Sequence, residues 1–190
     1  MPASTQQQMR TIPVSEAYIG KGDASIYKTV DAMREIIIAS SKNPYIRKWA
    51  QSILSRVPVN KKFAEVSAIH DFVRDNIRYT RDPHGWEYIQ TPPVLLDGIE
   101  AVKKLKAPRP IGDCDDMTTL SLSLIKSIGY PTAIKVVGFK VMDSDGYVPF
   151  SHVYGLVLID GRWYPCDTVR PDKSLGWEAT GSKRSLEIPV

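Results

Sequence analysis

The feature that most restricts the fold of this chain is a pair of alternating apolar runs joined by Asp160-Gly161. The first run is His152 to Ile159, and the second is Arg162 to Asp167. Asp-Gly readily adopts the positive φ angles of a two-residue type I′ turn, so the pattern predicts a β-hairpin with a fixed register. An antiparallel sheet is therefore expected in the C-terminal half.

The register of this hairpin brings a histidine beside a carboxylate. With Asp160-Gly161 in the turn, Tyr154 lies opposite Asp167. His152 shares a face with Tyr154, because side chains alternate along a strand. His152 and Asp167 are then diagonal neighbours, roughly 7–8 Å apart at the backbone. The two side chains are expected to meet in a hydrogen bond.

A cysteine stands at the start of the clearest helical segment. Residues 117–128 carry apolar side chains at helical spacing, and Gly129 follows them. Asp113 and Asp116 match an acidic variant of the capping box, so the helix is expected to begin at Cys114. The amides and the positive dipole end of a helix N-terminus favour a thiolate there. The neighbouring carboxylates oppose the thiolate, although helix capping uses part of their charge.

The order cysteine, histidine, aspartate is typical of a nucleophile, its base and the group that orients the base. We assign these roles to Cys114, His152 and Asp167. The backbone amide of Cys114 is one candidate donor for a tetrahedral oxyanion, and the side-chain amide of Gln90 is the other. The reaction class is acyl transfer from an amide through a thioester.

Other titratable residues are expected to be structural. His70 falls in a predicted helix and His84 in a loop rich in proline and glycine. Cys166 lies opposite Gly155 in the predicted register, on the face away from His152, and is expected to be a buried thiol. The aspartates around Cys114 offer an alternative, a metal site shared with His152 and Asp167. No zinc-type ligand spacing supports it, so no metal or cofactor is expected.

Further helices and strands are expected from the spacing of apolar residues and from the positions of proline and glycine along the chain. Three helices are expected before residue 78, and a loop-rich connection with one short helix spans residues 78–112. A strand and a turn should link the Cys114 helix to the hairpin. The expected ranges are helices at 27–40, from Pro44 with Asn43 as N-cap, 61–77 and 94–106, a strand at 132–142 and a turn at 143–146. The fold class is therefore α+β.

Composition limits the remaining possibilities. With 190 residues, 43% hydrophobic and 24% charged, the chain fits one soluble domain at 27–190 behind a loosely ordered arm at 1–26. The net charge of +4 is small, and the basic stretch 103–109 has no interleaved aromatics, so nucleic acid is not an expected partner. The chain shows no signal peptide and no apolar run of about 20 residues, so we expect no membrane contact and a cytoplasmic location, with association with a phage virion as the alternative.

Several motifs together resemble the transglutaminase-like superfamily, and most closely its short microbial and phage-associated members. The likeness covers about residues 60–170. It rests on an approach segment, the cysteine helix, the histidine strand and the aspartate strand. The matching residues are Ile77-Arg78-Tyr79, Asp82, Glu87, Gln90, Pro92, Gly112-Asp113-Cys114-Asp115-Asp116, Leu120, Leu124, Gly129-Tyr130-Pro131, Ser151-His152-Val153-Tyr154 and Gly161 to Thr168.

The resemblance implies a papain-like core, with helices and a central cysteine-bearing helix packed on an antiparallel sheet. It also implies thiol-dependent amide chemistry by Cys114, His152 and Asp167 on a peptide or protein substrate. The chain is much shorter than the calcium-dependent animal crosslinking enzymes and has no EF-hand loop. We therefore expect amide hydrolysis rather than glutamine–lysine crosslinking. The alternative is a catalytically silent binding or assembly module, for example in a phage particle.

Overall fold

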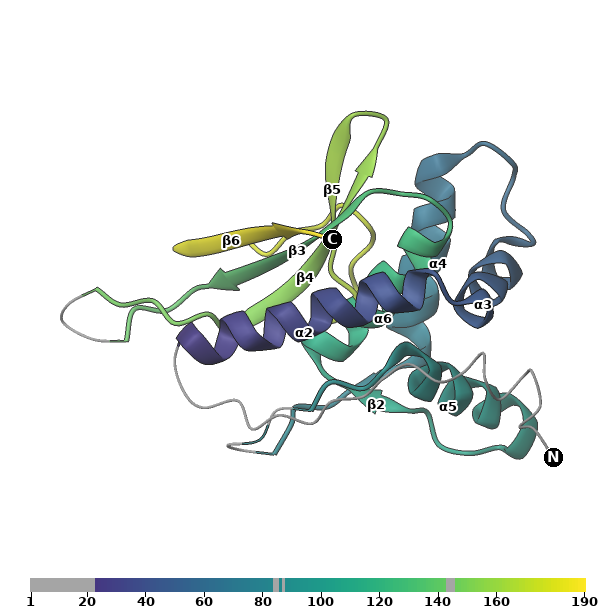
Figure 1. The fold of residues 1–190 in the computed structure, drawn as a ribbon, viewed down its shortest axis with the longest axis horizontal. Helices are drawn as coiled ribbons and strands as arrows, with labels where there is room; N and C mark the ends of the chain where they lie inside the picture. Colours follow the sequence, from purple (N-terminus) through teal and green to yellow (C-terminus); the bar gives the residue numbers. More distant parts are fainter. Residues whose placement is uncertain (1–22, 84–85, 87, 143–145) are drawn as a thin grey trace.

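The fold was obtained as a computed structural model, which describes residues 23–83, 86, 88–142 and 146–190 (Figure 1). In this part of the chain, helices pack against one another and against a four-stranded antiparallel sheet, and two short strands form a separate two-stranded sheet. The helices are α2 (Asp23–Ser41), α3 (Pro44–Leu54), α4 (Lys62–Asn76), α5 (Pro92–Leu105) and α6 (Cys114–Ser127). The strands are β1 (Arg78–Tyr79), β2 (Ile111–Gly112), β3 (Thr132–Gly138), β4 (His152–Ile159), β5 (Arg162–Cys166) and β6 (Arg184–Pro189).

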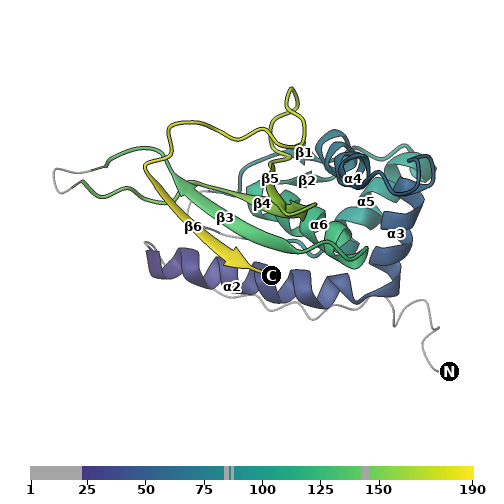
Figure 2. The ribbon, with the colours of Figure 1, turned by 90° about the horizontal axis from the view of Figure 1, so that it is seen from above.

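The strand order of the sheet is β5-β4-β3-β6, and every neighbouring pair is antiparallel. In Figure 2, α2 runs along one side of the sheet, and α3, α4 and α5 cluster at one end around α6. The expected α+β class and the helix-on-antiparallel-sheet arrangement are confirmed.

Helix α6 is the centre of this arrangement. Twelve of its 14 residues are buried, which only a helix surrounded by other elements allows. Several of its buried hydroxyls donate to nearby carbonyls: Ser121 donates to Met117 O at 2.7 Å, and Thr118 donates to Val153 O at 3.3 Å. The buried hydroxyl of Thr119 has no hydrogen-bond partner among the residues that the structure describes. The hydroxyl of Thr118 thus ties the cysteine helix directly to β4.

Glycine sets the spacing between α6 and β4. A Cβ at Gly155 would lie 2.5 Å from Leu122 Cδ2, which is far inside normal carbon–carbon contact. The absence of a side chain at residue 155 therefore lets the helix pack closely on the strand. This close approach fixes the position of Cys114 at the end of α6 relative to His152 at the start of β4.

The local signals of the sequence gave the correct elements, with shifts at their ends. Asn43 caps α3 through a hydrogen bond from Tyr45 N to its side chain at 2.9 Å, as expected from Asn43-Pro44. Strand β3 ends at Gly138, earlier than predicted, where a Cβ would lie 2.4 Å from Pro149 O. Of the predicted turn at 143–146, residues 143–145 lie outside the described part of the chain.

Two expectations need correction. Residues 23–26 are helical, although the sequence placed them in a loose arm. The Asp23 carboxylate accepts hydrogen bonds from Arg184 and Tyr147, both at 2.7 Å, and these bonds anchor the start of α2. The rest of that predicted arm, 1–22, lies outside the described residues. Strand β6 was not predicted, because only Leu186 and Ile188 supply its apolar alternation, and its pairing with β3 decides its conformation.

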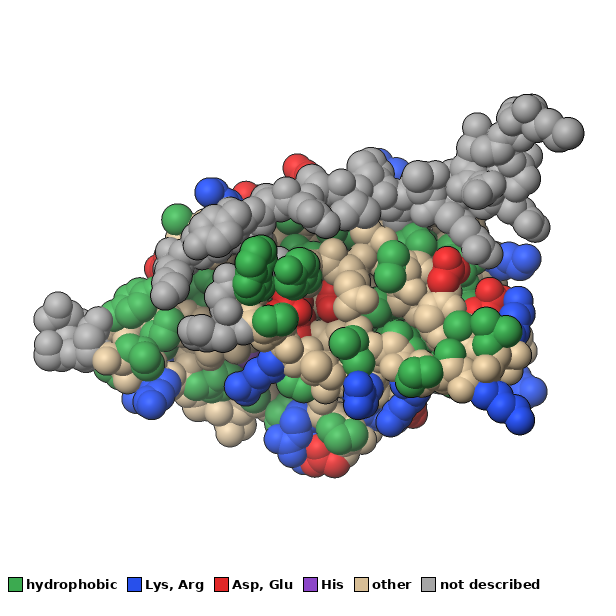
Figure 3. All heavy atoms as spheres, turned by 90° about the horizontal axis from the view of Figure 1, so that it is seen from below, with side chains coloured by type: hydrophobic (Ala, Val, Ile, Leu, Met, Phe, Trp, Pro, Cys, Tyr) green, Lys and Arg blue, Asp and Glu red, His purple; other side chains and the backbone are tan. Residues whose placement is uncertain are grey.

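The surface gives two further findings. No helix within the described ranges is long and apolar enough to cross a membrane. On the face that Figure 3 shows, lysine and arginine side chains are scattered and form no continuous stripe. The absence of a nucleic-acid partner remains a prediction.

Candidate active site

The helix cap places Cys114 as predicted. Asp113 is the N-cap of α6, and its side chain accepts from Asp115 N at 3.3 Å. Asp116 Oδ2 accepts from Asp113 N at 3.3 Å, which completes the reciprocal capping box. The half-buried Cys114 is therefore the first helical residue, where backbone amides and the helix dipole favour negative charge on sulfur.

The hairpin register is also confirmed. Asp160 and Gly161 have φ angles of 49° and 81°, as a type I′ turn requires, and Gly155 pairs with Cys166. The imidazole of His152 meets the carboxylate of Asp167, with 2.8 Å between Nε2 and Oδ2. The hydrogen bond predicted from the turn alone is therefore present.

Asp167 is held firmly enough to orient the imidazole. Its side chain is 2% exposed, and its second oxygen, Oδ1, accepts from Val169 N at 3.1 Å. Because the carboxylate engages Nε2 of His152, the nitrogen left for exchange with a substrate or thiol is Nδ1.

His70 supports the same segment from the helical layer. The sequence indicated only a structural or surface role, and the structure makes that role specific. The ring of His70 is fully buried, with Nε2 3.0 Å from Asp167 O and Nδ1 3.0 Å from the carboxylate of Asp71. His70 therefore links α4 to the backbone of Asp167. The other predicted histidine, His84, lies outside the described residues.

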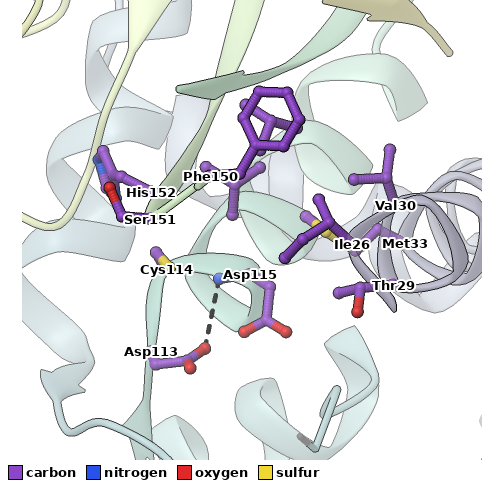
Figure 4. A pocket seen from close by; sticks show the side chains of 12 residues that line it. Ile26, Thr29, Val30, Met33, Asp113, Cys114, Asp115, Phe150, Ser151 and His152 are labelled. Carbon is purple, nitrogen blue, oxygen red and sulfur yellow. Dashed lines mark hydrogen bonds between the residues drawn. The ribbon is translucent and has the colours of Figure 1, made fainter. Parts of the chain in front are cut away.

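Cys114 and His152 open onto one pocket of about 210 Å³ (Figure 4). The two side chains lie together at one end of it, and residues of α2 form the other end. Ser151, Asp113 and Asp115 also line the pocket. Residues far apart along the chain thus meet at a single cavity, next to the His152–Asp167 pair.

Gln90 lies behind the cap of α6. Its side-chain Nε2 donates to Ile111 O at 2.9 Å and to Asp116 Oδ2 at 2.8 Å, and its backbone N donates to Asp116 Oδ1 at 2.6 Å. Both amide hydrogens are thus used to anchor the segment before α5 to the capping box. The role of Gln90 as an oxyanion donor stays a prediction.

Tyr79 is a residue near the nucleophile that the sequence reasoning did not single out. It lies on β1, which pairs in parallel with β2 directly before the cysteine helix, and Tyr79 pairs with Gly112. Burial raises the pKa of Tyr79, and the negative charge of Cys114 raises it further, while a hydrogen bond with Arg81 opposes both. The phenol of Tyr79 is therefore neutral, and it lies on the strand that pairs with the residues directly before Cys114. Two-residue strands leave no periodic signal, and Tyr79 was named only within the approach segment of the family resemblance, without a role.

The carboxylates around Cys114 differ in their surroundings. Asp113, Asp115 and Asp116 have ligand oxygens within 4.8 Å of one another. Burial raises the pKa of Asp116 to about 6, although hydrogen bonds from Gln90 and Asp113 favour its ionised form. Near neutral pH this carboxylate is mostly ionised, and below about 6 its proton reduces the negative charge next to the sulfur.

Cys166 is separate from this chemistry, as predicted. It is fully buried, forms no disulfide, and burial raises the pKa of its thiol. A thiol of this kind is a poor nucleophile.

The family assignment follows from this geometry and from comparison with known proteins. The model of the transglutaminase-like superfamily matches residues 47–168, which include the cysteine helix, the histidine strand and the aspartate. The chain belongs to this superfamily. It is thus an enzyme domain of a superfamily whose members use a cysteine.

One solved structure is similar in fold, and a second matches more weakly. A putative protease from Parabacteroides distasonis is 14% identical with a TM-score of 0.54; the match covers 82% of this chain and 32% of that one. A putative cysteine protease from Cytophaga hutchinsonii is 16% identical with a TM-score of 0.45, over 96% of this chain and 57% of that one. This chain thus spans about a third and somewhat more than half of their lengths. The search of curated proteins found no match.

Proposed function

We propose that this chain catalyses cysteine-dependent acyl transfer on amide bonds, with hydrolysis of a peptide or amide as the main reaction. The observation that carries the proposal is the buried Asp167 carboxylate on His152 Nε2 at 2.8 Å, next to a pocket that also exposes Cys114. The carboxylate fixes the tautomer of the imidazole and leaves Nδ1 for the thiol.

The proposed reaction has two half-reactions. His152 takes the proton of Cys114, and the thiolate attacks the amide carbonyl carbon. The C–N bond then breaks, His152 protonates the leaving amine, and the acyl group remains on sulfur as a thioester. Water, activated by His152, attacks the thioester and releases the acid; an amine in its place would give a new amide.

The oxyanion of each tetrahedral intermediate needs hydrogen-bond donors. The backbone amide of Cys114 at the start of α6 is the first candidate. Tyr79, whose raised pKa keeps its hydroxyl a donor, is a second candidate near the sulfur. Gln90 fills this role only if it releases one of its two hydrogen bonds, to Ile111 O or to Asp116.

Alkylation and turnover test the proposal together. Iodoacetamide is expected to modify Cys114 much faster than it modifies glutathione, and a peptide library with a fluorescent primary amine is expected to give cleavage that Cys114→Ala abolishes. Incorporation of the amine in place of cleavage would make the protein a crosslinking acyltransferase. Ordinary thiol reactivity without turnover would favour a silent binding or assembly module and would refute the proposal.

A further inference from the structure

The wall of the pocket opposite Cys114 is built by α2. Ile26, Thr29, Val30 and Met33 project from one side of this helix into the cavity (Figure 4). Val30 is 2% exposed and Met33 is fully buried, so this part of the wall is held in place by the core. Val136, Phe150 and Val153 complete the apolar lining from the sheet side.

Arg184 fixes the two walls relative to each other. Its guanidinium pairs with Asp23 at the start of α2, with 2.7 Å between Nη2 and Oδ2. The same group lies over the ring of Phe150, 4.2 Å from the ring centroid, in cation–π geometry. The apolar end of the pocket is therefore a preformed shape, because one side chain braces both of its sides.

The size of the cavity limits what it can hold. An apolar cavity of about 150 Å³ accepts benzene, and sites for drug-sized molecules start near about 300 Å³. This pocket has a volume of about 210 Å³. It therefore fits one branched aliphatic or aromatic group, in addition to the reacting amide at Cys114.

The polar part of the lining disfavours a bound carboxylate. Among the residues that the structure describes, the ionisable side chains that line the pocket besides Cys114 and His152 are Asp113 and Asp115. Asp115 is 2% exposed, and its Oδ2 has no hydrogen-bond partner among the residues that the structure describes. A carboxylate brought next to this buried oxygen would lose its hydration without gaining a hydrogen-bond donor from it.

We propose that this pocket is a specificity subsite for an uncharged apolar group adjacent to the reacting amide, and that α2 determines the selectivity. The inference rests on the proposed function and adds a substrate class to it. Helix α2 spans Asp23–Ser41, outside the region 47–168 that the superfamily model matches. The α2 wall of the subsite therefore lies outside the matched region, whereas Val136, Phe150 and Val153 lie within it.

Alkylation of Cys114 by three related reagents tests the subsite without a known substrate. The reagents are iodoacetamide and its N-isobutyl and N-carboxymethyl derivatives, with rates read by mass spectrometry of the peptide containing Cys114 and divided by the rates for glutathione. N-isobutyl iodoacetamide is expected to react at least about tenfold faster than iodoacetamide, the gain typical of apolar groups in a matching pocket. The N-carboxymethyl reagent is expected to react more slowly than iodoacetamide.

Two neighbouring positions on α2 provide the variant and its control. Ile26→Trp fills the pocket and is expected to remove the preference for the isobutyl reagent. Lys28→Trp makes an equally large change on the exposed side of the same helix and is expected to keep it. Ile26→Ala, which removes contacts without adding bulk, is expected to reduce the preference severalfold and replaces Ile26→Trp if that variant does not fold.

The outcomes separate the two proposals. Equal normalised rates for the three reagents, or a preference that survives in both Ile26 variants, would overturn the subsite, whatever the absolute reactivity of Cys114. Slow alkylation by all reagents with the isobutyl preference intact would refute the proposed catalytic function and support the pocket. Fast, Cys114-dependent chemistry without any apolar preference would do the reverse.

Discussion

Replacing Gly155 with alanine tests whether the spacing between α6 and β4 controls both stability and reactivity. The new Cβ would lie 2.5 Å from Leu122 Cδ2 and 3.0 Å from Leu122 Cγ. Carbon atoms in contact are normally about 3.5–4.0 Å apart, so the buried Leu122 side chain, and with it the helix, is expected to move away from the strand by up to roughly 1 Å. Overpacking of this kind costs about 1–3 kcal/mol of unfolding free energy.

The same displacement should reach the active site. Cys114 begins α6 and His152 begins β4, so a shift of roughly 1 Å between these elements changes the approach of thiol and imidazole. Misplacement on this scale can lower a rate by about 100-fold. We therefore expect Gly155→Ala to slow the alkylation of Cys114 by iodoacetamide, as well as lowering the midpoint of urea unfolding followed by circular dichroism.

A double-mutant cycle isolates the contact. Leu122→Ala removes the three carbons that lie within 3.4 Å of the new Cβ and alone should cost about 2–5 kcal/mol through the cavity it leaves. In the double variant the alanine methyl partly refills that cavity, so the two effects should couple by about 1–3 kcal/mol, with recovery of the alkylation rate. Gly181→Ala is the control: nothing lies within 4 Å of its Cβ, and its φ of +83° gives only local strain. Simple additivity of Gly155→Ala and Leu122→Ala, or a Gly155→Ala variant as stable as wild type, would refute the reasoning.

Four further predictions concern single residues. Asp167→Asn should lower kcat by about 10²–10⁴-fold with a much smaller effect on stability, because it keeps the shape but holds His152 in the wrong tautomer; steady-state kinetics and thermal unfolding together check this. His70→Ala should cost about 2 kcal/mol or more in urea unfolding, since it leaves the carbonyl of Asp167 unpaired and opens a cavity; unchanged stability would contradict the role assigned to His70. The pKa of Asp116 is raised from 3.8 to about 6 in the folded protein, so its contribution to stability is present at low pH and falls by about 3 kcal/mol as the pH rises through this range. Urea unfolding across these pH values should show that slope in wild type and not in Asp116→Asn. Iodoacetamide should label one cysteine in the native protein and two in urea, as counted by intact mass, because Cys166 is fully buried.

The sequence predicted the parts of the site that depend on local rules. The Asp160-Gly161 turn has its own backbone preference, and a turn fixes the pairing of every residue along both strands. This rule alone brought His152 and Asp167 together. The cap of α6 is equally local, since Asp113 and Asp116 satisfy amides within one turn of helix.

The parts that the sequence did not predict depend on contacts between distant segments. Tyr79 is paired with Gly112, two residues before Cys114, by a parallel pair of two-residue strands, which has no periodicity to detect. The contact of His70 with Asp167 joins residues 97 positions apart. Strand β6 exists because β3 offers it an edge, and Gln90 was placed in a loop whose path only the hydrogen bonds to Asp116 define.

The division of the reacting groups between α6 and the hairpin has a consequence for the newly synthesised chain. During synthesis, the ribosome releases the sulfur well before the imidazole and its carboxylate have emerged. Until the hairpin docks on the helix, Cys114 is an ordinary thiol without an imidazole beside it. Local unfolding that separates the hairpin from the helix would return Cys114 to the same state. Under the proposed function, chemical competence of this protein therefore depends on completed tertiary structure.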